Sequence, residues 1–210
     1  MCNGILGKKV GMTNVYASDG SLVPVTVVQA GPCVVTQVKT EKTDGYEAVQ
    51  LGFDEKSIEK CSKPLQGHFE KSGSKGYTSL CEFRVSASVS YEPGQDITLD
   101  MFAVGDRITV SGTSKGRGFA GTVKRYGFGR GPETHGSRNH RAPGSVGCSA
   151  WPARIVKGKK MPGHLGVDRK TVKNLEIVDI RPEDNLILIK GAVPGHRAGI
   201  LEIKKTNPSV

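Results

Sequence analysis

Residues 22–39 read LVPVTVVQAGPCVVTQVK, and this stretch sets the expected fold class. It contains two runs, 22–30 and 33–39, that are rich in β-branched side chains and separated by Gly31 and Pro32. β-branched side chains pack well on a pleated sheet, whereas a Gly-Pro pair interrupts a regular strand. We therefore expect two consecutive β-strands here.

Short runs of the same kind lie on both sides, with turn signals such as Asp19-Gly20 and Asp44-Gly45 between them. The runs are YEAVQLGF (46–53), SLCEFRV (79–85), RITVS (107–111), VKNLEIVDI (172–180), LILIK (186–190) and ILEIK (200–204). Residues 55–72 are compatible with a short helix, which Pro64 and Gly67 weaken. Many short strands at about ten-residue spacing, with little helix signal, predict a mainly β protein, either a closed barrel or a sandwich.

Residues 113–166 interrupt this pattern with a block that carries the net charge of the chain. The block holds eleven Lys or Arg and one acid, Glu133, whereas the other 156 residues hold 19 basic and 19 acidic residues. It contains twelve Gly and only five Val, Ile or Leu. These apolar residues do not recur at the spacing that would give a helix or a strand one buried face. Like charges at this density repel, so no separate core is expected. The block is far longer than an ordinary loop and is expected to be one insertion between two strands.

The block is predicted to contact nucleic acid rather than to serve as a solvated linker. Phe119, Tyr126, Phe128 and Trp151 are interleaved with its cations, and flat rings among cations suit stacked bases and a phosphate backbone. Trp151 has two interpretations, as an anchor on the barrel or as a ring that stacks on a base. The expected nucleic-acid contacts are Lys115, Arg117, Lys124, Arg125, Arg130, Arg138, His140, Arg141, Trp151, Arg154, Lys157, Lys159 and Lys160.

Three catalytic or cofactor patterns are present only in incomplete form. The sequence from Gly116 to Gly121 fits G-x-G-x-x-G, the glycine pattern of dinucleotide-binding sites. Such a site needs a helix that begins at the glycines and an acid about 20 residues later for the ribose. Here the next residues, TVKRYGFGRG, do not predict a helix, and position 141 is Arg. Cys148 with a nearby histidine lacks a third, orienting group for nucleophilic catalysis. The histidines of the block lack thiols or acids at metal-ligand spacing. We expect no enzyme activity, no cofactor and no metal.

The bulk properties predict a cytoplasmic protein with a polyanionic partner. The 210 residues fit one domain, or one and a half. A membrane-spanning helix needs about 20 consecutive apolar residues, and no apolar run here is that long. The N-terminus lacks the apolar segment of a secretory signal. Five scattered cysteines without a C-x-x-C pair argue against a disulfide framework and a zinc ribbon. No membrane or small-molecule partner is expected.

Seven segments occur in the order and at the spacing of one known family. They are GILGKKVGMT (4–13), VPVTVV (23–28), VTQVKTEKTDGYEAVQLGF (35–53), GTSKGRGFAGTVKRYGF (112–128), PGSVG (143–147), KGKKMPGHLG (157–166) and LILIKGAVPG (186–195). Together, over about residues 4–204, they resemble the bacterial-type ribosomal protein L-three of the large subunit.

The resemblance implies a six-stranded Greek-key barrel of the translation-protein type, formed by residues 1–112 and 167–210, with residues 40–95 as a small α+β excursion. It implies that 113–166 is an extension that passes through large-subunit rRNA toward the peptidyl transferase centre. It further implies binding near the 3′ end of that rRNA, a role in nucleating assembly, and contacts with neighbouring large-subunit proteins. The family is structural, so its members are not themselves catalysts.

Several points separate this chain from its relatives or leave alternatives open. Some bacterial relatives carry an N-methylated glutamine in the tip of the extension, whereas residues 144–166 here contain no Gln, so that modification is expected to be absent.

Two other functions remain as alternatives. A DNA-compacting architectural protein would also need a basic arm, and a nucleotide-using enzyme would need the glycine pattern. Either a bacterial or an organellar source is compatible with the sequence.

Overall fold

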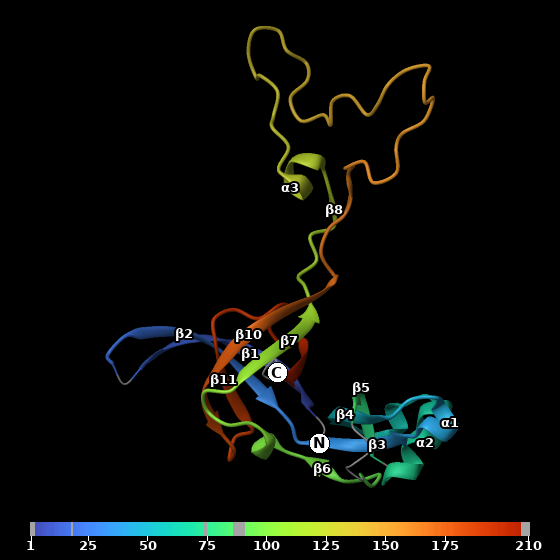
Figure 1. Cartoon of the computed structure of the whole chain (residues 1–210), viewed down its shortest axis with the longest axis vertical. Coiled ribbons are helices and arrows are strands. Elements are labelled where there is room, and N and C mark those ends of the chain that lie inside the picture. Colours follow the sequence, from blue (N-terminus) through green and yellow to red (C-terminus); the bar gives the residue numbers. More distant parts are fainter. Residues whose placement is uncertain (1–2, 18, 74, 86–90, 207–210) are drawn as a thin grey trace. The chain divides into compact units, whose positions relative to one another are not determined.

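The computed structural model describes residues 3–17, 19–73, 75–85 and 91–206. The chain forms two compact units (Figure 1). Unit 1 holds Met1–Thr113 with Arg169–Val210, and unit 2 holds Ser114–Asp168. Unit 1 carries the long strands, and unit 2 is mostly irregular chain.

Unit 1 contains a closed barrel of six antiparallel strands in the order β1-β12-β7-β10-β11-β2 (Figure 1). The strands are β1 (Gly4–Tyr16), β2 (Leu22–Ala30), β7 (Arg107–Thr113), β10 (Arg169–Arg181), β11 (Leu186–Lys190) and β12 (Ile200–Lys205). The expected mainly β fold with a six-stranded barrel is therefore confirmed, and of the two architectures left open by strand spacing, the barrel is the one formed.

The barrel closes around the aliphatic side chains that its strands turn inward. On β7, Ile108 and Val110 are buried on either side of the half-buried Thr109, as the period of two along a strand requires. On β11 the middle residues 187–189 are all buried, so this strand is covered on both faces. Each such aliphatic side chain contributes about 1.5–3 kcal/mol through removal from water.

A second, four-stranded sheet in the order β5-β4-β3-β6 belongs to the same unit. Its strands are β3 (Cys33–Lys39), β4 (Ala48–Lys56), β5 (Gly76–Arg84) and β6 (Asp96–Ile97). The short helical segments around it are α1 (Glu41–Asp44), η1 (Ile58–Lys60), α2 (Lys63–Phe69), η2 (Glu70–Ser72) and η3 (Leu99–Met101). Leu51 and Phe83 of this sheet belong to the same buried cluster as Ile5 and Ile203 of the barrel, so the two sheets share one core.

Helix α2 lies within the stretch for which the sequence gives a weak helix signal. Pro64 occupies the first turn, where the missing amide donor costs nothing and the fixed φ angle favours the helix. At the other end Phe69 is fully buried and its ring packs edge-on against Tyr77 at 5.6 Å between ring centroids. His68 Nε2 also lies 2.7 Å from Gln50 Oε1 on β4, so the helix contacts the sheet through both an aromatic pair and a polar pair.

Unit 2 contains the two-residue strands β8 (Phe119–Ala120) and β9 (Gly163–His164), which pair antiparallel, and helix α3 (Thr122–Tyr126). The helix contradicts the expectation that no helix follows Gly121. Gly127 ends it in the left-handed conformation at φ 72°, and the Gly127 amide donates to the carbonyl of Val123 at 2.9 Å. Among the described residues, no helix of either unit is long and apolar enough to span a membrane.

Candidate nucleic-acid interface

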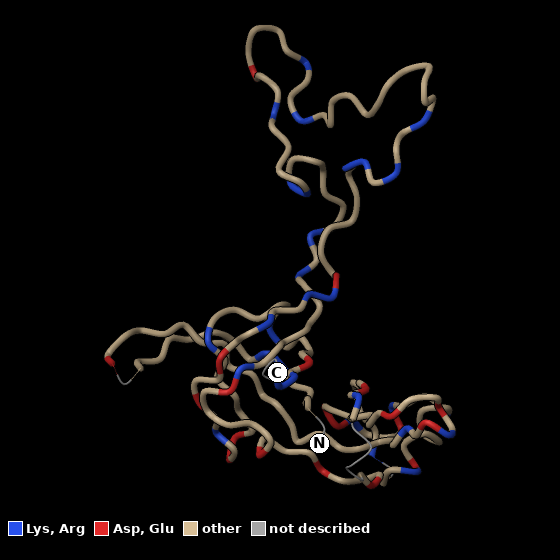
Figure 2. Tube along the Cα trace, in the orientation of Figure 1, with Lys and Arg blue, Asp and Glu red and all other residues tan. Residues whose placement is uncertain are grey.

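The eleven cations of the basic block all lie in unit 2, where they contribute blue segments along its whole length (Figure 2). Every residue of unit 2 is described, and within it the single ion pair joins Arg130 Nη1 to Glu133 Oε1 at 3.0 Å. Both side chains of that pair are exposed, so it is worth less than about 1 kcal/mol. Ten cations therefore have no acidic partner within the unit and remain available to an external anion.

The two sides of the block run antiparallel where unit 2 begins and ends. The amide of Ser114 donates to the carbonyl of Asp168 at 2.9 Å, and the amide of Arg117 donates to the carbonyl of Leu165 at 2.9 Å. Gly166 is required here because it has φ +84° and a Cβ at that position would lie 2.1 Å from the carbonyl oxygen of Lys115. The base of the block is therefore ordered by its own backbone.

Arg125 connects the helix to the returning side of the block. Its Nη1 donates to the carbonyl of Met161 at 2.8 Å, and its guanidinium lies over the Tyr126 ring at 5.1 Å. Lys160 Nζ also lies over that ring, at 5.8 Å, and Phe128 packs against it with ring centroids 6.2 Å apart. The structure thus brings two predicted site residues, Arg125 and Lys160, together at one aromatic ring.

A first loop beyond this cluster, residues 130–141, carries four further predicted residues. It is closed by the amide of Gly131, which donates to the carbonyl of His140 at 3.0 Å, while His140 Nδ1 lies 3.1 Å from the carbonyl of Pro132. Arg130 makes the internal ion pair described above. Arg138 and Arg141 are exposed and directed to no acid in the unit.

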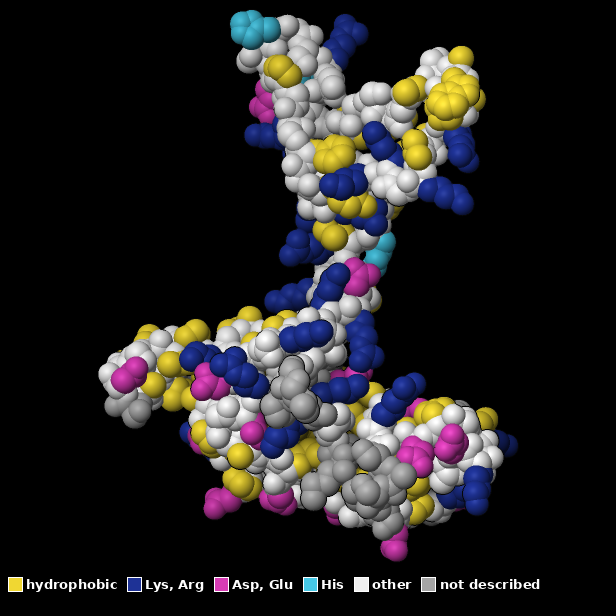
Figure 3. Space-filling view, viewed as in Figure 1, with side chains coloured by type: hydrophobic (Ala, Val, Ile, Leu, Met, Phe, Trp, Pro, Cys, Tyr) yellow, Lys and Arg dark blue, Asp and Glu magenta, His cyan; other side chains and the backbone are white. Residues whose placement is uncertain are grey.

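A second loop, around residues 146–156, presents apolar side chains together with cations (Figure 3). Trp151 is 86% exposed, and Val146, Ile155 and Val156 are exposed as well. An exposed ring packs in no core of unit 2, and its face is free for stacking. Both interpretations of Trp151, the anchor on the barrel and the ring that stacks on a base, therefore stay predictions.

Twelve of the thirteen predicted contact residues are exposed, and Arg125 alone is half-buried. The structure does not gather them into one pocket, because they follow the two sides and the two loops of an extended segment. Sequence reasoning omitted Phe119 from the contact set, although its ring is 80% exposed beside the exposed Arg117. It also omitted Lys170 and Lys173 of β10, which are exposed on unit 1.

The glycine pattern and the histidines of the basic block lie in unit 2. The glycine pattern leads into a five-residue helix beside an antiparallel pair, whereas dinucleotide binding needs a longer helix packed on a parallel sheet. No group of three His, Cys, Asp or Glu among the described residues is placed to hold a metal ion.

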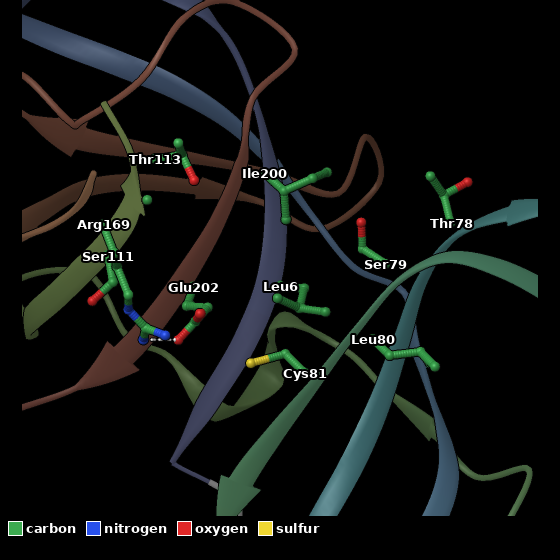
Figure 4. A pocket seen from close by; sticks show the side chains of 11 residues that line it. Leu6, Thr78, Ser79, Leu80, Cys81, Ser111, Thr113, Arg169, Ile200 and Glu202 are labelled. Carbon is green, nitrogen blue, oxygen red and sulfur yellow. Dashed lines mark hydrogen bonds and ion pairs between the residues drawn. The ribbon is translucent and has the colours of Figure 1, made fainter. Parts of the chain in front are cut away.

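Unit 1 does contain a cavity of about 460 Å³ between β5 and the barrel strands (Figure 4). Arg169 and Glu202 form an ion pair on its wall, and the Cys81 thiol lies beside the Glu202 carboxylate (Figure 4). Burial, reinforced by the carboxylate of Glu202, raises the pKa of the Cys81 thiol to about 11. A thiol with this pKa is almost fully protonated at neutral pH and is a poor nucleophile.

The sequence was compared with known protein families and curated proteins. The family model of ribosomal protein L3 matches residues 86–185. The large ribosomal subunit protein uL3 of Desulforapulum autotrophicum is 69% identical, with 98% of this chain and 99% of that protein covered. The uL3 proteins of Desulfatibacillum aliphaticivorans and Syntrophobacter fumaroxidans are 60% and 51% identical, covering 98% and 99% of this chain and 97% and 99% of those proteins. These similarities span both units, confirm the resemblance read from the seven segments, and establish that the chain belongs to the ribosomal protein L3 family.

Proposed function

We propose that the chain is a non-catalytic, structural constituent of the large ribosomal subunit in the cytoplasm, and that unit 2 is its principal rRNA-binding element. Ten cations in unit 2 without an internal acidic partner carry this proposal. The phosphate backbone of RNA supplies the counter-charge that the chain itself lacks.

The finer part of the proposal is argued from the resemblance to the family. We infer that the protein binds near the 3′ end of the large-subunit rRNA, helps to nucleate subunit assembly, and directs its second loop toward the peptidyl transferase centre. The exposed ring of Trp151 and the exposed aliphatic side chains around it support insertion among bases, where a stacked ring contributes about 1–3 kcal/mol. Neighbouring large-subunit proteins are the other expected partners.

The roles of the site residues divide by chemistry. Arg117, Arg138, Arg141 and Arg154 are exposed guanidinium groups that can form paired hydrogen bonds to phosphate and stack on bases. The lysines, exposed throughout unit 2, act as point charges on phosphate. Arg125 is different because its guanidinium already donates to the Met161 carbonyl, so it orders the segment as well as adding charge.

A salt titration tests the proposal. Affinity for a large-subunit rRNA fragment is measured for the intact chain and for a variant in which a short Gly-Ser turn joins Thr113 to Arg169, which are paired across β7 and β10. If about eight cations meet phosphates, log K should fall against log salt with a slope of about −6. The folded deletion variant should lose most of that slope. An unchanged slope and affinity would show that unit 1 binds the RNA.

A matched pair of charge variants refines the test. Replacing Arg154, Lys157 and Lys159 by Gln should reduce the slope by about 2, at about 0.7 per contact. The control replaces Lys60, Lys63 and Lys71, which are exposed on unit 1, and should leave the slope unchanged. Duplex DNA that competes as well as rRNA would instead indicate an architectural DNA-binding protein.

A further inference from the structure

The hairpin formed by β1 and β2 extends past the barrel of unit 1 (Figure 1). Strand β1 pairs with β12 only over Gly4–Lys8, and β2 pairs with β11 only over residues 25–29. Residues 11–16 and 22–23 therefore pair only within the hairpin, whereas the Pro24 carbonyl already accepts from the Gly191 amide at 2.8 Å. We call these residues the distal ribbon. An isolated two-stranded ribbon is at best marginally stable in water, so it gains from a partner that covers it.

One face of the distal ribbon carries three exposed large apolar side chains, with the polar Asn14 between two of them. Tyr16 and Leu22 lie directly opposite each other in the register and are 76% and 54% exposed. Met12 lies on the same face as Tyr16, four residues earlier along β1, and is 50% exposed. Figure 3 shows apolar side chains along this hairpin. Several large apolar side chains exposed together on one face mark an interaction surface.

The turn at the end of the ribbon is fixed in place by an acid. Asp19 Oδ1 accepts hydrogen bonds from the Ser21 amide at 2.9 Å and the Ser21 hydroxyl at 2.6 Å. These hydrogen bonds lower the pKa of Asp19, so its carboxylate is ionised at neutral pH. The end of the hairpin therefore presents a fixed negative charge next to the Tyr16–Leu22 pair.

The charge of this hairpin is opposite to what an RNA contact needs. Residues 10–30 contain no Lys or Arg and one acid, Asp19, in a chain whose net charge is +10. An rRNA backbone placed here would meet the Asp19 carboxylate and no Lys or Arg of the hairpin itself, and this repulsion grows as water is excluded. A protein surface with apolar side chains and a neighbouring cation complements both features of the ribbon.

We propose that the distal ribbon is the docking surface for a second protein of the large subunit, which presents an apolar patch bordered by Lys or Arg. Tyr16, Leu22 and Met12 supply the apolar contact, and Asp19 faces the basic border. This inference rests on the proposed function, because it takes the chain to be a constituent of that subunit. It assigns protein and RNA contacts to separate elements, with unit 2 binding RNA and the ribbon binding protein.

Site-specific photocrosslinking in assembled subunits tests the proposal. Large subunits are reconstituted from rRNA and the other large-subunit proteins, with the photoreactive residue p-benzoylphenylalanine replacing Tyr16. The control carries it at Thr13, which is exposed on the opposite face of the ribbon. Irradiation should join position 16, and not position 13, to an identified ribosomal protein within a peptide that contains apolar and basic residues. A crosslink to rRNA, to a second copy of this chain or to no molecule would overturn the inference.

A competition experiment separates this inference from the proposed function. The double variant Tyr16→Ser, Leu22→Ser competes with the unaltered chain for entry into reconstituted subunits, and each chain is also titrated with the rRNA fragment alone. Loss of an aromatic anchor and its neighbour should weaken entry by at least about tenfold. Affinity for the fragment alone should not change, because the ribbon does not touch RNA. The control Val104→Ser alters an apolar side chain of comparable exposure, 63%, elsewhere on unit 1 and should enter normally.

The outcomes are distinct. Equal entry of the double variant and the unaltered chain would overturn the docking surface while leaving RNA binding intact. A loss of affinity for the RNA fragment in the double variant would show that the ribbon binds RNA and would also overturn it. If the unaltered chain neither binds the fragment nor enters subunits, the proposed function fails, and the docking surface fails with it.

Discussion

The ring of Phe83 on β5 fills the space beside Gly4 on β1, so that a Cβ at Gly4 would lie 2.3 Å from Cε1 of Phe83. The same Cβ would lie 2.8 Å from the carbonyl oxygen of Ile203 on β12. Phe83 is fully buried, and Lys204 Nζ lies 5.4 Å from its ring centroid. The contact therefore joins the four-stranded sheet to the barrel through a position where only glycine fits.

Gly4→Ala should destabilise unit 1 by about 1–3 kcal/mol, the usual cost of forcing a methyl group into a well-packed core. Urea unfolding followed by circular dichroism measures the change. Gly11→Ala on the same strand is the control, since its Cβ would meet no atom within 4 Å, and it should be neutral or slightly stabilising. Equal midpoints for the two variants would contradict the packing between Gly4 and Phe83.

Asp106 should give unit 1 a stability that depends on pH. A hydrogen bond from Lys205 Nζ at 2.7 Å, followed by one from the Ala103 amide, lowers the pKa of this carboxyl. Because the pKa in the folded protein is below that in the unfolded chain, the stabilisation is present above about pH 4 and is lost as pH falls through the folded pKa.

Asp106→Asn should therefore reduce stability at pH 7 by about 1 kcal/mol or less, since the ion pair is partly exposed. Below about pH 4 the difference between the variant and the unaltered chain should shrink toward zero. Urea titrations at pH 7 and at pH 3 measure both quantities. A difference that grows on acidification would contradict the assigned direction of the pKa shift.

The cysteines should differ in reactivity according to exposure. Cys148 is exposed, Cys33 and Cys61 are buried, and Cys81 is half-buried with its pKa raised to about 11. At pH 8 roughly one Cys81 thiol in a thousand is ionised, and the thiolate is the reactive form.

In a chain carrying Cys2→Ser, iodoacetamide should modify Cys148 at least about tenfold faster than Cys81, as measured by peptide mass spectrometry. Cys33 and Cys61 should react only after denaturation. Labelling of Cys81 at the rate of Cys148 would show that its environment does not raise the pKa.

Arg125→Ala should loosen the base of unit 2. The substitution removes the hydrogen bond to the Met161 carbonyl and the contact with the Tyr126 ring, so the amides of Arg125 and Gly127 that close α3 should exchange about tenfold faster. Hydrogen exchange measured by mass spectrometry over residues 121–128 detects this. Lys124→Ala removes one exposed charge from the same helix and should leave exchange unchanged. Equal exchange in both variants would mean that Arg125 acts only as a charge.

The strands could be read from the sequence because their signal is local. The β-branched run at 22–30 and the apolar run at 186–190 each form a strand within a residue of the expected bounds. Which strands are neighbours could not be derived from those runs, because barrel order depends on pairings such as that of β1 with β12, nearly 200 residues apart in the chain. The resemblance supplied that information.

The positive charge of unit 2 could also be read from the sequence, but the contacts that order the unit could not. Helix α3 has five residues and is held by Gly127 and by the contact from Arg125 to Met161, which is 36 residues away. No local periodicity reports such a contact. The same limit applies to the distal ribbon, since its residues read as ordinary strand and only the pairing pattern shows that they leave the barrel.

The position of β12 between β1 and β7 has a consequence for biosynthesis. The gap between those two strands stays open until residues 200–205 have emerged from the ribosome that makes them, so the barrel cannot close while the nascent chain is shorter. Unit 2 precedes β12 in the chain and therefore emerges first. A newly made molecule thus exposes its basic segment before its hydrophobic core is sealed, and during that interval it is most vulnerable to aggregation and to premature capture by RNA.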